Sequence, residues 1–432
     1  MFATQKVRIK KLSLDEYEAM RLLHRYAKNL YNVGLYALRQ HYFATGKLLG
    51  FTILYHQCKS NENYRMIQAG ASQQILKNAH EAMKSFLSLS RKAAQGQYPQ
   101  EKVRMPKYLP KDSYGQISCS ANAISIRNGY FLVPMSRSFA KAHPGLNITI
   151  KVPSRIADLA IKEVRLNPLY YARYLEAEFV YKTKREKMQS RQMSGVLALD
   201  LGVDALAAGI STNGVAFLID GKRLKAENQW YNKERARLQA VKSAKKYETR
   251  KMAAIAYNRE NLMRDYMSKS GHLILHYCLD NKIGKVVVGV NPGWKQQINI
   301  GRTNNQNFVQ IPFWKFRRFL KHLCEQNGIA YAEITESYTS KASFLDRDIL
   351  PEFNAESIEG FMFSGKRIKR GLYRSSNGRT VNADLNAAAN ILRKAVPDAD
   401  LSAIDRALCL NPVRFYPLAT QKKRLLKSKA AA

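Results

Sequence analysis

The stretch Val196–Asp220, VLALDLGVDALAAGISTNGVAFLID, decides the fold of the C-terminal half of this 432-residue chain. Its first part, Val196–Asp200, is a continuous apolar run that ends in an acid, which is typical of a buried strand. A second run, Asp204–Ser211, and a third, Val215–Asp220, are separated by Thr212-Asn213-Gly214, which is typical of a turn. The pattern therefore predicts three consecutive strands.

The segments that follow complete one domain. A long basic helical pattern covers about Lys225–Asn281, and Lys285–Val290 is a strand rich in β-branched residues. Next come a predicted helix at Pro312–Asn327, a strand at Ile329–Glu336 and a helix at Ala383–Ala395. Three meandering strands followed by helix, strand, helix and strand is the order of an RNase H-like nuclease domain. We therefore expect an α/β fold.

The N-terminal half has a different pattern. Lys6–Lys10 alternates like a short strand, and Ser13 with Glu16 forms a capping box at the start of helical sequence. The helical pattern ends near Tyr98, and Asn128-Gly129 beyond it is a strong hairpin signal. Further strands are expected at Ala123–Arg127, Tyr130–Pro134, Asn147–Val152, Ile161–Leu166 and Ala172–Tyr181. A helical block inserted after the first strand of a small β-barrel is the simplest account.

The charge of the chain predicts a polyanionic partner. There are 71 Lys and Arg residues against 33 Asp and Glu, a formal net charge of +38. Self-repulsion of this size disfavours a compact state, and neutralised phosphates release counterions that favour binding. Nucleic acid is the first candidate and an anionic membrane surface the second. We find neither a signal peptide nor an apolar run of the roughly 18 residues that a spanning helix needs.

The five cysteines form no CxxC pair, which indicates a reduced, cytoplasmic protein without a cysteine-based zinc site. A cytoplasmic location is therefore expected.

Three acids stand out in so basic a chain. Asp200 and Glu336 each end a predicted strand, and Asp384 lies in a helix whose apolar residues pack inward. Three such carboxylates are able to hold two Mg²⁺ or Mn²⁺ ions, which activate a water and stabilise a leaving oxygen. Each acid alone also has a plain structural interpretation, as a turn residue, a surface ion-pair partner or a helix N-cap. Their joint occurrence in this element order favours a metal-dependent hydrolase.

Four segments then resemble one family. They are ALDLGVDALAAGISTNG, NNQNFVQIPFWKFRRFLKHLCEQNGI, ESYTSKASFLD and NADLNAAANIL, and together they span most of residues 195–394. They resemble TnpB, the transposon-encoded ancestor of the compact type V CRISPR effectors. The resemblance implies a wedge-like β-barrel with a helical recognition insert, followed by a RuvC-like nuclease domain. It also implies a guide RNA and a target double-stranded DNA with a short flanking motif.

The basic stretch Lys182–Arg191 is typical of a linker, and the resemblance implies a domain organisation on either side of it. We expect the wedge-like barrel at residues 1–11 and 97–190, the helical insert at 12–96, the RuvC-like domain at 194–340 and 381–396, a basic insert at 341–380 and a basic tail at 397–432.

Two positions depart from the family pattern. By that pattern Asp200 is the first catalytic acid and Asp384 the third, but the strand that should end in the second acid has Gly289 instead. Glu336 ends the next strand of the domain, so we expect it to be a relocated second acid. The family also often has paired CxxC motifs before its last acid, whereas residues 341–382 contain no cysteine. We therefore expect no zinc. The insert is strongly basic through Lys366, Arg367, Lys369, Arg370 and Arg374.

Residues that combine positive charge, amide groups and aromatic rings are candidates for binding nucleic acid. A basic helical stripe suits the backbone of an A-form heteroduplex, and an aromatic residue among cations suits single-stranded nucleic acid. Each has an alternative, a solvated helix face for the stripe and a core position for Trp294. The candidates are Lys107, Tyr108, Arg235, Arg237, Lys242, Lys245, Lys246, Trp294, Lys295, Arg302, Asn304, Asn305, Tyr338 and Lys341.

The sequence as a whole predicts an RNA-guided DNA endonuclease that acts as a monomer in its complex. Pairing between guide and target would supply the sequence specificity. Three alternatives stay open: a guide-dependent DNA-binding repressor that does not cut, a guide-independent RNase H-like nuclease, and a structural RNA-binding protein.

Overall fold

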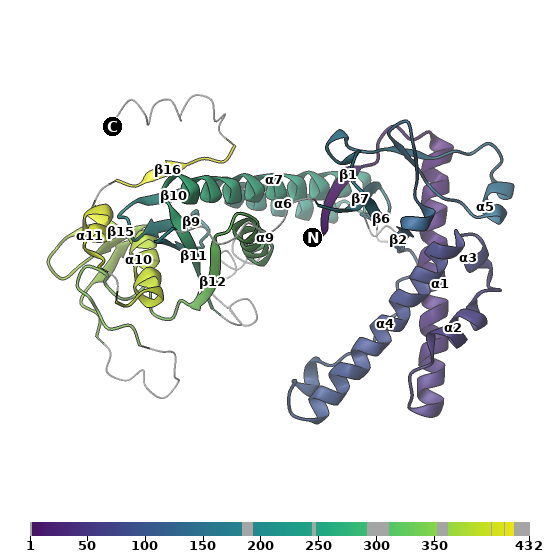
Figure 1. Ribbon diagram of the computed structural model, residues 1–432, viewed down its shortest axis with the longest axis horizontal. Helices are drawn as coiled ribbons and strands as arrows, with labels where there is room; N and C mark the ends of the chain where they lie inside the picture. Colours follow the sequence, from purple (N-terminus) through teal and green to yellow (C-terminus); the bar gives the residue numbers. More distant parts are fainter. Residues whose placement is uncertain are drawn as a thin grey trace. The chain divides into compact units, whose positions relative to one another are not determined.

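The computed structural model describes residues 2–183, 193–243, 248–291, 311–351, 362–398, 400–409 and 411–418. The chain divides into two compact units, Met1–Arg185 and Glu186–Ala432. Figure 1 shows the first unit in purple to blue and the second in teal to yellow. The boundary lies within the stretch that the sequence predicts as a linker.

The first unit contains a helical block. Its helices are α1 (Leu14–Thr45), α2 (Phe51–Cys58), α3 (Glu62–Arg65) and α4 (Ala69–Ala94). The predicted capping box starts α1, because Glu16 N donates to Ser13 Oγ at 3.1 Å and Ser13 N donates to Glu16 Oε2 at 2.7 Å. Gly34 lets α1 and α4 approach closely, since a Cβ there would lie 2.8 Å from Leu76 Cδ2. These four helices lie in the stretch for which the sequence predicts helical structure.

The strands of the first unit form two antiparallel sheets. One has the order β1-β7-β6-β2 and the other β3-β4-β5. β1 pairs with β7, so the helices are inserted after the first strand, as predicted. Asn128 and Gly129 both have positive φ angles in the predicted hairpin, 50° and 77°. The bounds are β1 (Phe2–Arg8), β2 (Ile117–Ser120), β3 (Ser125–Arg127), β4 (Tyr130–Leu132), β5 (Thr149–Lys151), β6 (Ile161–Leu169) and β7 (Tyr174–Lys182), with one further helix, α5 (Arg137–Ala142), and the 3-10 turns η1 (Gln100–Lys102), η2 (Ala121–Ala123) and η3 (Ser154–Ile156).

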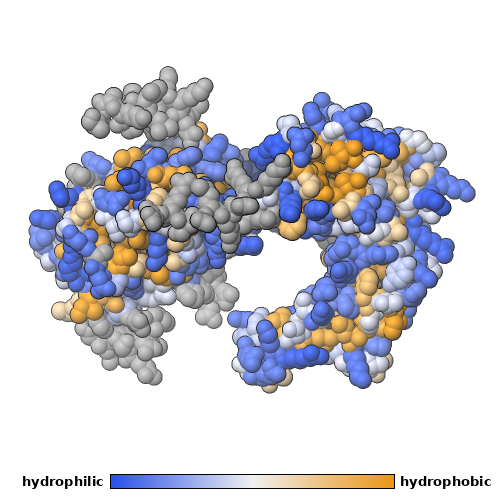
Figure 2. Space-filling view, in the orientation of Figure 1, coloured by the Kyte–Doolittle hydropathy of each residue, from blue (hydrophilic) through white to orange (hydrophobic). Residues whose placement is uncertain are grey.

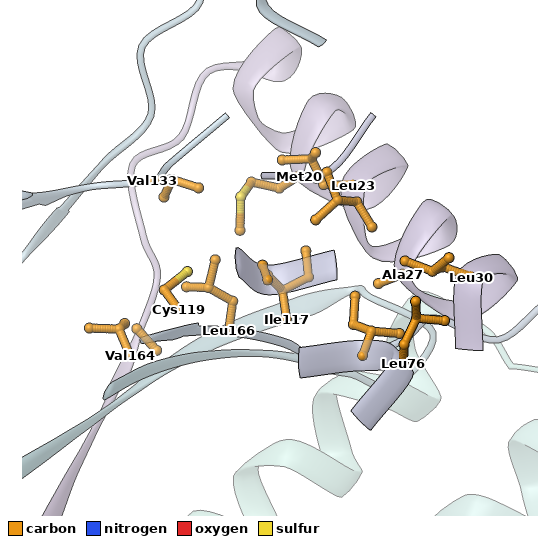
Figure 3. Packing of buried hydrophobic residues seen from close by; sticks show 14 of the residues in the cluster. Met20, Leu23, Ala27, Leu30, Leu76, Ile117, Cys119, Val133, Val164 and Leu166 are labelled. Carbon is orange, nitrogen blue, oxygen red and sulfur yellow. The ribbon is translucent and has the colours of Figure 1, made fainter. Parts of the chain in front are cut away.

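One apolar core joins the helices to these sheets. Figure 3 shows Met20, Leu23, Ala27 and Leu30 of α1 near apolar side chains of the four-stranded sheet. Phe131 of β4 also meets Phe179 of β7 edge-on, with ring centroids 6.3 Å apart. The two sheets therefore belong to one folded body.

The second unit is built on a six-stranded sheet with the order β12-β11-β8-β9-β10-β16. β8, β9 and β10 are antiparallel neighbours, whereas β11 runs parallel to β8 and β12 parallel to β11. The three predicted meandering strands are thus confirmed, as are the two strands that follow. The bounds are β8 (Gly195–Asp200), β9 (Ala205–Ser211), β10 (Ala216–Asp220), β11 (Ile283–Val290), β12 (Ala330–Thr335) and β16 (Val413–Phe415).

Helices cover both faces of this sheet. Leu197 and Leu199 of β8 join a core with α7 and α9, while Val196 and Ala198 join another core with α10 and α11. Because both faces are buried, the strand reads as a continuous apolar run rather than an alternating one. The helices are α6 (Lys222–Ala240), α7 (Arg250–Asp280), α9 (Phe313–Gln326), α10 (Ala383–Ala395) and α11 (Ser402–Cys409).

Two expectations for this unit need correction. The basic region expected as one helical pattern forms two helices, α6 and α7, which pack against each other. The C-terminal region expected as a basic tail contributes α11 and the edge strand β16, which pairs in parallel with β10. Its apolar residues, including Leu401 and Ile404, are buried in the sheet's second core, which explains why the region is folded.

A small three-stranded sheet precedes α10. It consists of β13 (Lys366–Lys369), β14 (Leu372–Arg374) and β15 (Thr380–Asn382), and β15 leads directly into α10. Asp348 accepts hydrogen bonds from Ser343 N and Ser364 N, and Tyr373 Oη donates to Lys341 O at 2.7 Å. Buried and partly buried hydrogen bonds of this kind hold the insert together.

Candidate active site and nucleic-acid interface

The carboxyl ends of three parallel strands form the site. Asp200 is the last residue of β8, Glu336 directly follows β12, and β11 lies between these two strands. Ligands often bind at this edge of a parallel sheet. Asp384 approaches the same edge from the first turn of α10, the helix that packs on β8. The fold therefore brings together three acids that are far apart in sequence.

Asp200 lies among the other two acids. Burial raises the pKa of its carboxyl well above the usual range, and the negative charges of Glu336 and Asp384 raise it further. The guanidinium of Arg367 partly opposes this effect. Charges act in this way over short separations, so Asp200 lies close to each of the other two carboxylates.

Glu336 occupies the space left by Gly289. A Cβ at Gly289 would lie 2.9 Å from Glu336 Oε2, so the carboxyl group lies directly over this glycine. Asn291 Nδ2 donates to Glu336 Oε1 at 2.8 Å, and Glu336 N donates to Val290 O at 3.2 Å. Burial raises the pKa of Glu336, and Arg317 opposes the shift. Glu336 thus reaches the position beside β11 that the sequence leaves without an acid.

Asp384 is not the cap of its helix. Asn382 is the N-cap, and its Oδ1 accepts from Asp384 N at 3.0 Å and from Leu385 N at 3.1 Å. The side chain of Asp384 is therefore available to the site. Burial raises the pKa of its carboxyl, whereas Arg367 and other cations lower it. The predicted apolar face of α10, including Leu385 and Ile391, is buried as expected.

Basic side chains of the insert face the acids. Arg367 Nη2 lies 3.6 Å from Asp384 Oδ1, and Arg370 pairs with Asp204. Asp204 also pairs with Lys225 at 3.0 Å and raises the pKa of Asp384. Asp204 was not among the acids predicted from the sequence, although its position four residues after Asp200 was a usable signal.

The three candidate acids offer carboxylate oxygens as donors. Carboxylate oxygens suit Mg²⁺ or Mn²⁺, and burial without a cation leaves each of the three acids with a raised pKa. Within the described residues, no three Asp, Glu, His or Cys side chains already surround a single point as the ligands of one ion would. Water and phosphate oxygens complete such shells in proteins, so a closed protein cage is not required.

Two of the expected nucleic-acid residues adjoin the acids. Tyr338 and Lys341 lie in the loop after Glu336, and Lys341 Nζ is 5.9 Å from the centroid of the Tyr338 ring. Tyr338 adopts a positive φ of 62°, and its ring also contacts Phe363. The loop therefore presents a cation and an aromatic ring beside the acidic site.

The basic helix α6 offers a further surface. Arg235 is exposed, whereas Arg237 Nη2 pairs with Glu234 at 2.7 Å, and Lys242 follows the end of the helix. Hydrophilic residues surround smaller hydrophobic patches on the visible face of each unit (Figure 2). Seven of the expected residues lie outside the described residues: Lys245, Lys246, Trp294, Lys295, Arg302, Asn304 and Asn305.

Lys107 and Tyr108 belong to the first unit. Tyr108 is 41% exposed, and the Arg39 guanidinium lies 4.8 Å from its ring centroid. Asn32 fixes this segment by exchanging two hydrogen bonds with the backbone of Leu109, at 2.8 and 2.9 Å. The structure thus places these two residues on a surface segment of the first unit that Asn32 holds in place.

The arrangement defines a class of protein. It is a multidomain α/β protein in which three carboxylates lie at one edge of a mixed sheet, beside a basic insert. In the described part of the chain, no helix has the length and apolar character needed to cross a membrane.

Comparisons with known proteins agree with this class. A family model described as a probable transposase matches residues 176–294, and one described as Cas12f1-like, TNB domain, matches residues 313–391. A TnpB-like protein, ORF457, from Acidianus two-tailed virus is 24% identical over 433 residues, which cover 91% of this chain and 86% of that protein. The chain is therefore TnpB-like and related to the compact type V effectors, which confirms the resemblance predicted from its sequence.

A solved structure agrees on the fold. The Cas12f1 chain in a cryo-EM structure of the Cas12f1–sgRNA–target DNA complex matches with a TM-score of 0.55 and 14% sequence identity. The match covers 88% of this chain and 83% of that one. It therefore extends over both units.

Proposed function

We propose that this protein is an RNA-guided DNA endonuclease that hydrolyses target DNA at Asp200, Glu336 and Asp384. The observation that carries the proposal is the meeting of these acids at one sheet edge, with Glu336 filling the space over Gly289. A net charge of +38 and the fold shared with a protein solved together with guide RNA and target DNA support a nucleic-acid substrate.

The three carboxylates would hold Mg²⁺ or Mn²⁺, which supplies an activated water and stabilises the leaving oxygen. Asn291 orients Glu336 by its hydrogen bond to Oε1, and the apolar core beneath α10 fixes the helix that carries Asp384. Arg367 and Arg370 offset the acidic charge in the absence of cations. When cations are bound to the acids, the guanidinium groups of Arg367 and Arg370 are suited to binding phosphates of the substrate strand.

The two units would have different functions. The first unit would contain the wedge-like barrel and helical recognition insert, and would bind guide RNA and the flanking motif of the target, with Tyr108 as one contact. Residues 194–340 and 381–396 would form the RuvC-like nuclease domain, whose α6 carries Arg235 for the phosphate backbone. Tyr338 and Lys341 would guide the strand that is cut. Base pairing with the guide would select the sequence.

The test uses the purified ribonucleoprotein. RNA that copurifies with the protein is sequenced, and a DNA duplex matched to that RNA is offered with Mg²⁺ or with EDTA. We expect cleavage only with Mg²⁺ and only of matched DNA. Cleavage that persists after RNase treatment of the protein would instead establish a guide-independent nuclease.

Gly289 favours a second candidate, because the strand position that normally carries the second acid has no carboxyl group. In that case the protein would be a guide-dependent repressor. Tight binding of matched DNA without any cut, unchanged in Glu336→Ala, would establish this candidate and overturn the first.

A further inference from the structure

Helix α10 carries two asparagines in its buried interior. Asn386 and Asn390 are both 0% exposed and lie four residues apart, on one side of the helix. Asparagine is a poor residue for a helix interior, because its side chain competes with the backbone for hydrogen bonds. A buried amide is also costly unless it is hydrogen-bonded. Contacts outside the helix must therefore account for the presence of these two asparagines.

Both amides bind the loop that follows Glu336. Asn390 Nδ2 donates to Thr339 O at 2.9 Å and to Ala342 O at 2.8 Å. Asn386 Nδ2 also donates to Ala342 O, at 2.8 Å, and its Oδ1 accepts from Phe344 N at 3.0 Å. All of these side-chain hydrogen bonds are made to one short stretch of loop, residues 339–344.

The same loop is tied back to Glu336. Thr339 Oγ1 donates to Glu336 O at 2.9 Å, and Thr339 is itself buried. A continuous path therefore runs from Asn390 through the carbonyl and hydroxyl groups of Thr339 to the backbone of Glu336. Lys394, also on α10, adds a hydrogen bond to Ser337 O at 2.8 Å. The helix that carries Asp384 thus holds the loop whose first residues follow Glu336.

Asn390 Oδ1 is buried and has no hydrogen-bond partner among the described residues. Leaving a buried acceptor unpaired costs about 1–3 kcal/mol. A side chain chosen for stability alone would avoid this cost, whereas a side chain chosen to donate twice to the loop accepts it. The orientation of the amide therefore indicates that Asn390 serves to position the loop after Glu336.

We infer that Asn386 and Asn390 are positioning residues that set the carboxylate of Glu336 relative to that of Asp384. The inference rests on the proposed function, because it concerns the cation site formed by these acids. A relocated second acid comes from a loop beyond β12 rather than from the end of β11, so its backbone needs a support of its own. The two amides supply that support.

The experiment measures Mn²⁺ binding to the full chain without nucleic acid, by calorimetry and by the Mn²⁺ electron paramagnetic resonance spectrum. The variants are Asn390→Ala, Asn386→Ala and Thr339→Val, the last being nearly isosteric and therefore the least disruptive to folding. Asn228→Ala is the matched control, since Asn228 is also a 0% exposed asparagine in a helix, α6, and contacts none of the three acids. Thermal unfolding verifies that each variant folds.

We expect the Mn²⁺ dissociation constant to rise about 10–100-fold in the two asparagine variants, as is usual when a residue that orients a ligand is removed. Thr339→Val should show a smaller rise. Asn228→Ala should lose thermal stability while binding Mn²⁺ like the wild type. Folded variants of Asn386, Asn390 and Thr339 that all bind Mn²⁺ as the wild type does would overturn the inference.

Different experimental results would refute the inference and the proposed function. If the wild-type ribonucleoprotein cuts no DNA but the asparagine variants still weaken Mn²⁺ binding, the positioning role stands and the nuclease proposal falls. If the wild type cuts matched DNA and the variants cut at its rate with its Mn²⁺ requirement, the nuclease proposal stands and the positioning role falls.

Discussion

Replacing Gly289 by alanine adds one methyl group where the structure has no room. The new Cβ would lie 2.4 Å from Ile391 Cδ1 and 2.9 Å from Glu336 Oε2. Ile391 is fully buried in the core between the sheet and α10, so it has little freedom to move away. The remaining direction of relief is displacement of the Glu336 carboxyl group.

Two effects of different size follow. Overpacking a buried site typically costs about 1–3 kcal/mol of stability. For a folded unit of this size, each kcal/mol lowers Tm by roughly 2–4 °C. Displacement of a catalytic group by about 1 Å lowers the rate by up to 10²-fold. We therefore expect Gly289→Ala to lose far more cleavage activity than its fall in stability explains.

The assay combines thermal unfolding with single-turnover cleavage of guide-matched DNA. Gly209→Ala is the control, because its Cβ would lie 2.4 Å from Phe217 Cζ in the same sheet but would not meet Glu336. We expect both variants to be destabilised and only Gly289→Ala to lose its cleavage rate selectively. If Gly289→Ala unfolds and cuts like the wild type, the reasoning on Glu336 and Gly289 is refuted.

Further predictions concern charge. The pKa of Asp200 is raised in the folded protein, so the native state retains a proton that the unfolded state releases, and the stability of the metal-free protein falls as the pH rises through that pKa. Calorimetry without metal should therefore show that Asp200→Asn is more stable than the wild type at neutral pH and that its stability depends less on pH. The variant should not cut DNA. Equal stability of the two proteins at every pH would contradict this prediction. On α6, Arg235→Ala should lower the slope of log affinity for guide RNA against log salt by about 0.7–0.9 in a filter-binding assay. Arg237→Ala should change the slope less, because Arg237 is paired with Glu234; equal changes would argue against this difference.

Much of the second unit was predictable because its strands are buried on both faces. Val196–Asp200 reads as one apolar run, and the acid at its end is found at the sheet edge. The helix predicted at Pro312–Asn327 is α9 (Phe313–Gln326), and Gly328 directly beyond its C-cap Asn327 has a positive φ of 71°, as is common for glycine after a helix end. Patterns that depend on neighbouring residues along the chain were therefore reliable.

The contacts between distant segments were not predictable in the same way. That Glu336 lies over Gly289 depends on the register of β12 against β11, in which Gly289 pairs with Ile334. The asparagines of α10 look like ordinary polar positions in the sequence NAAAN, since the loop they bind lies more than 40 residues away. The break between α6 and α7 was missed because the basic pattern is continuous across it.

The most direct measurement of the central claim is the single-turnover cleavage rate of Glu336→Gln beside that of Glu333→Gln. Glu333 lies on the same strand, but its carboxylate is bound by Arg317 at 2.9 Å and by Tyr331 at 2.8 Å. Loss of a cation ligand should remove several kcal/mol of transition-state stabilisation, a fall in rate of about 10³-fold. We expect that fall for Glu336→Gln and near wild-type cleavage for Glu333→Gln, whereas wild-type cleavage by Glu336→Gln would contradict the account.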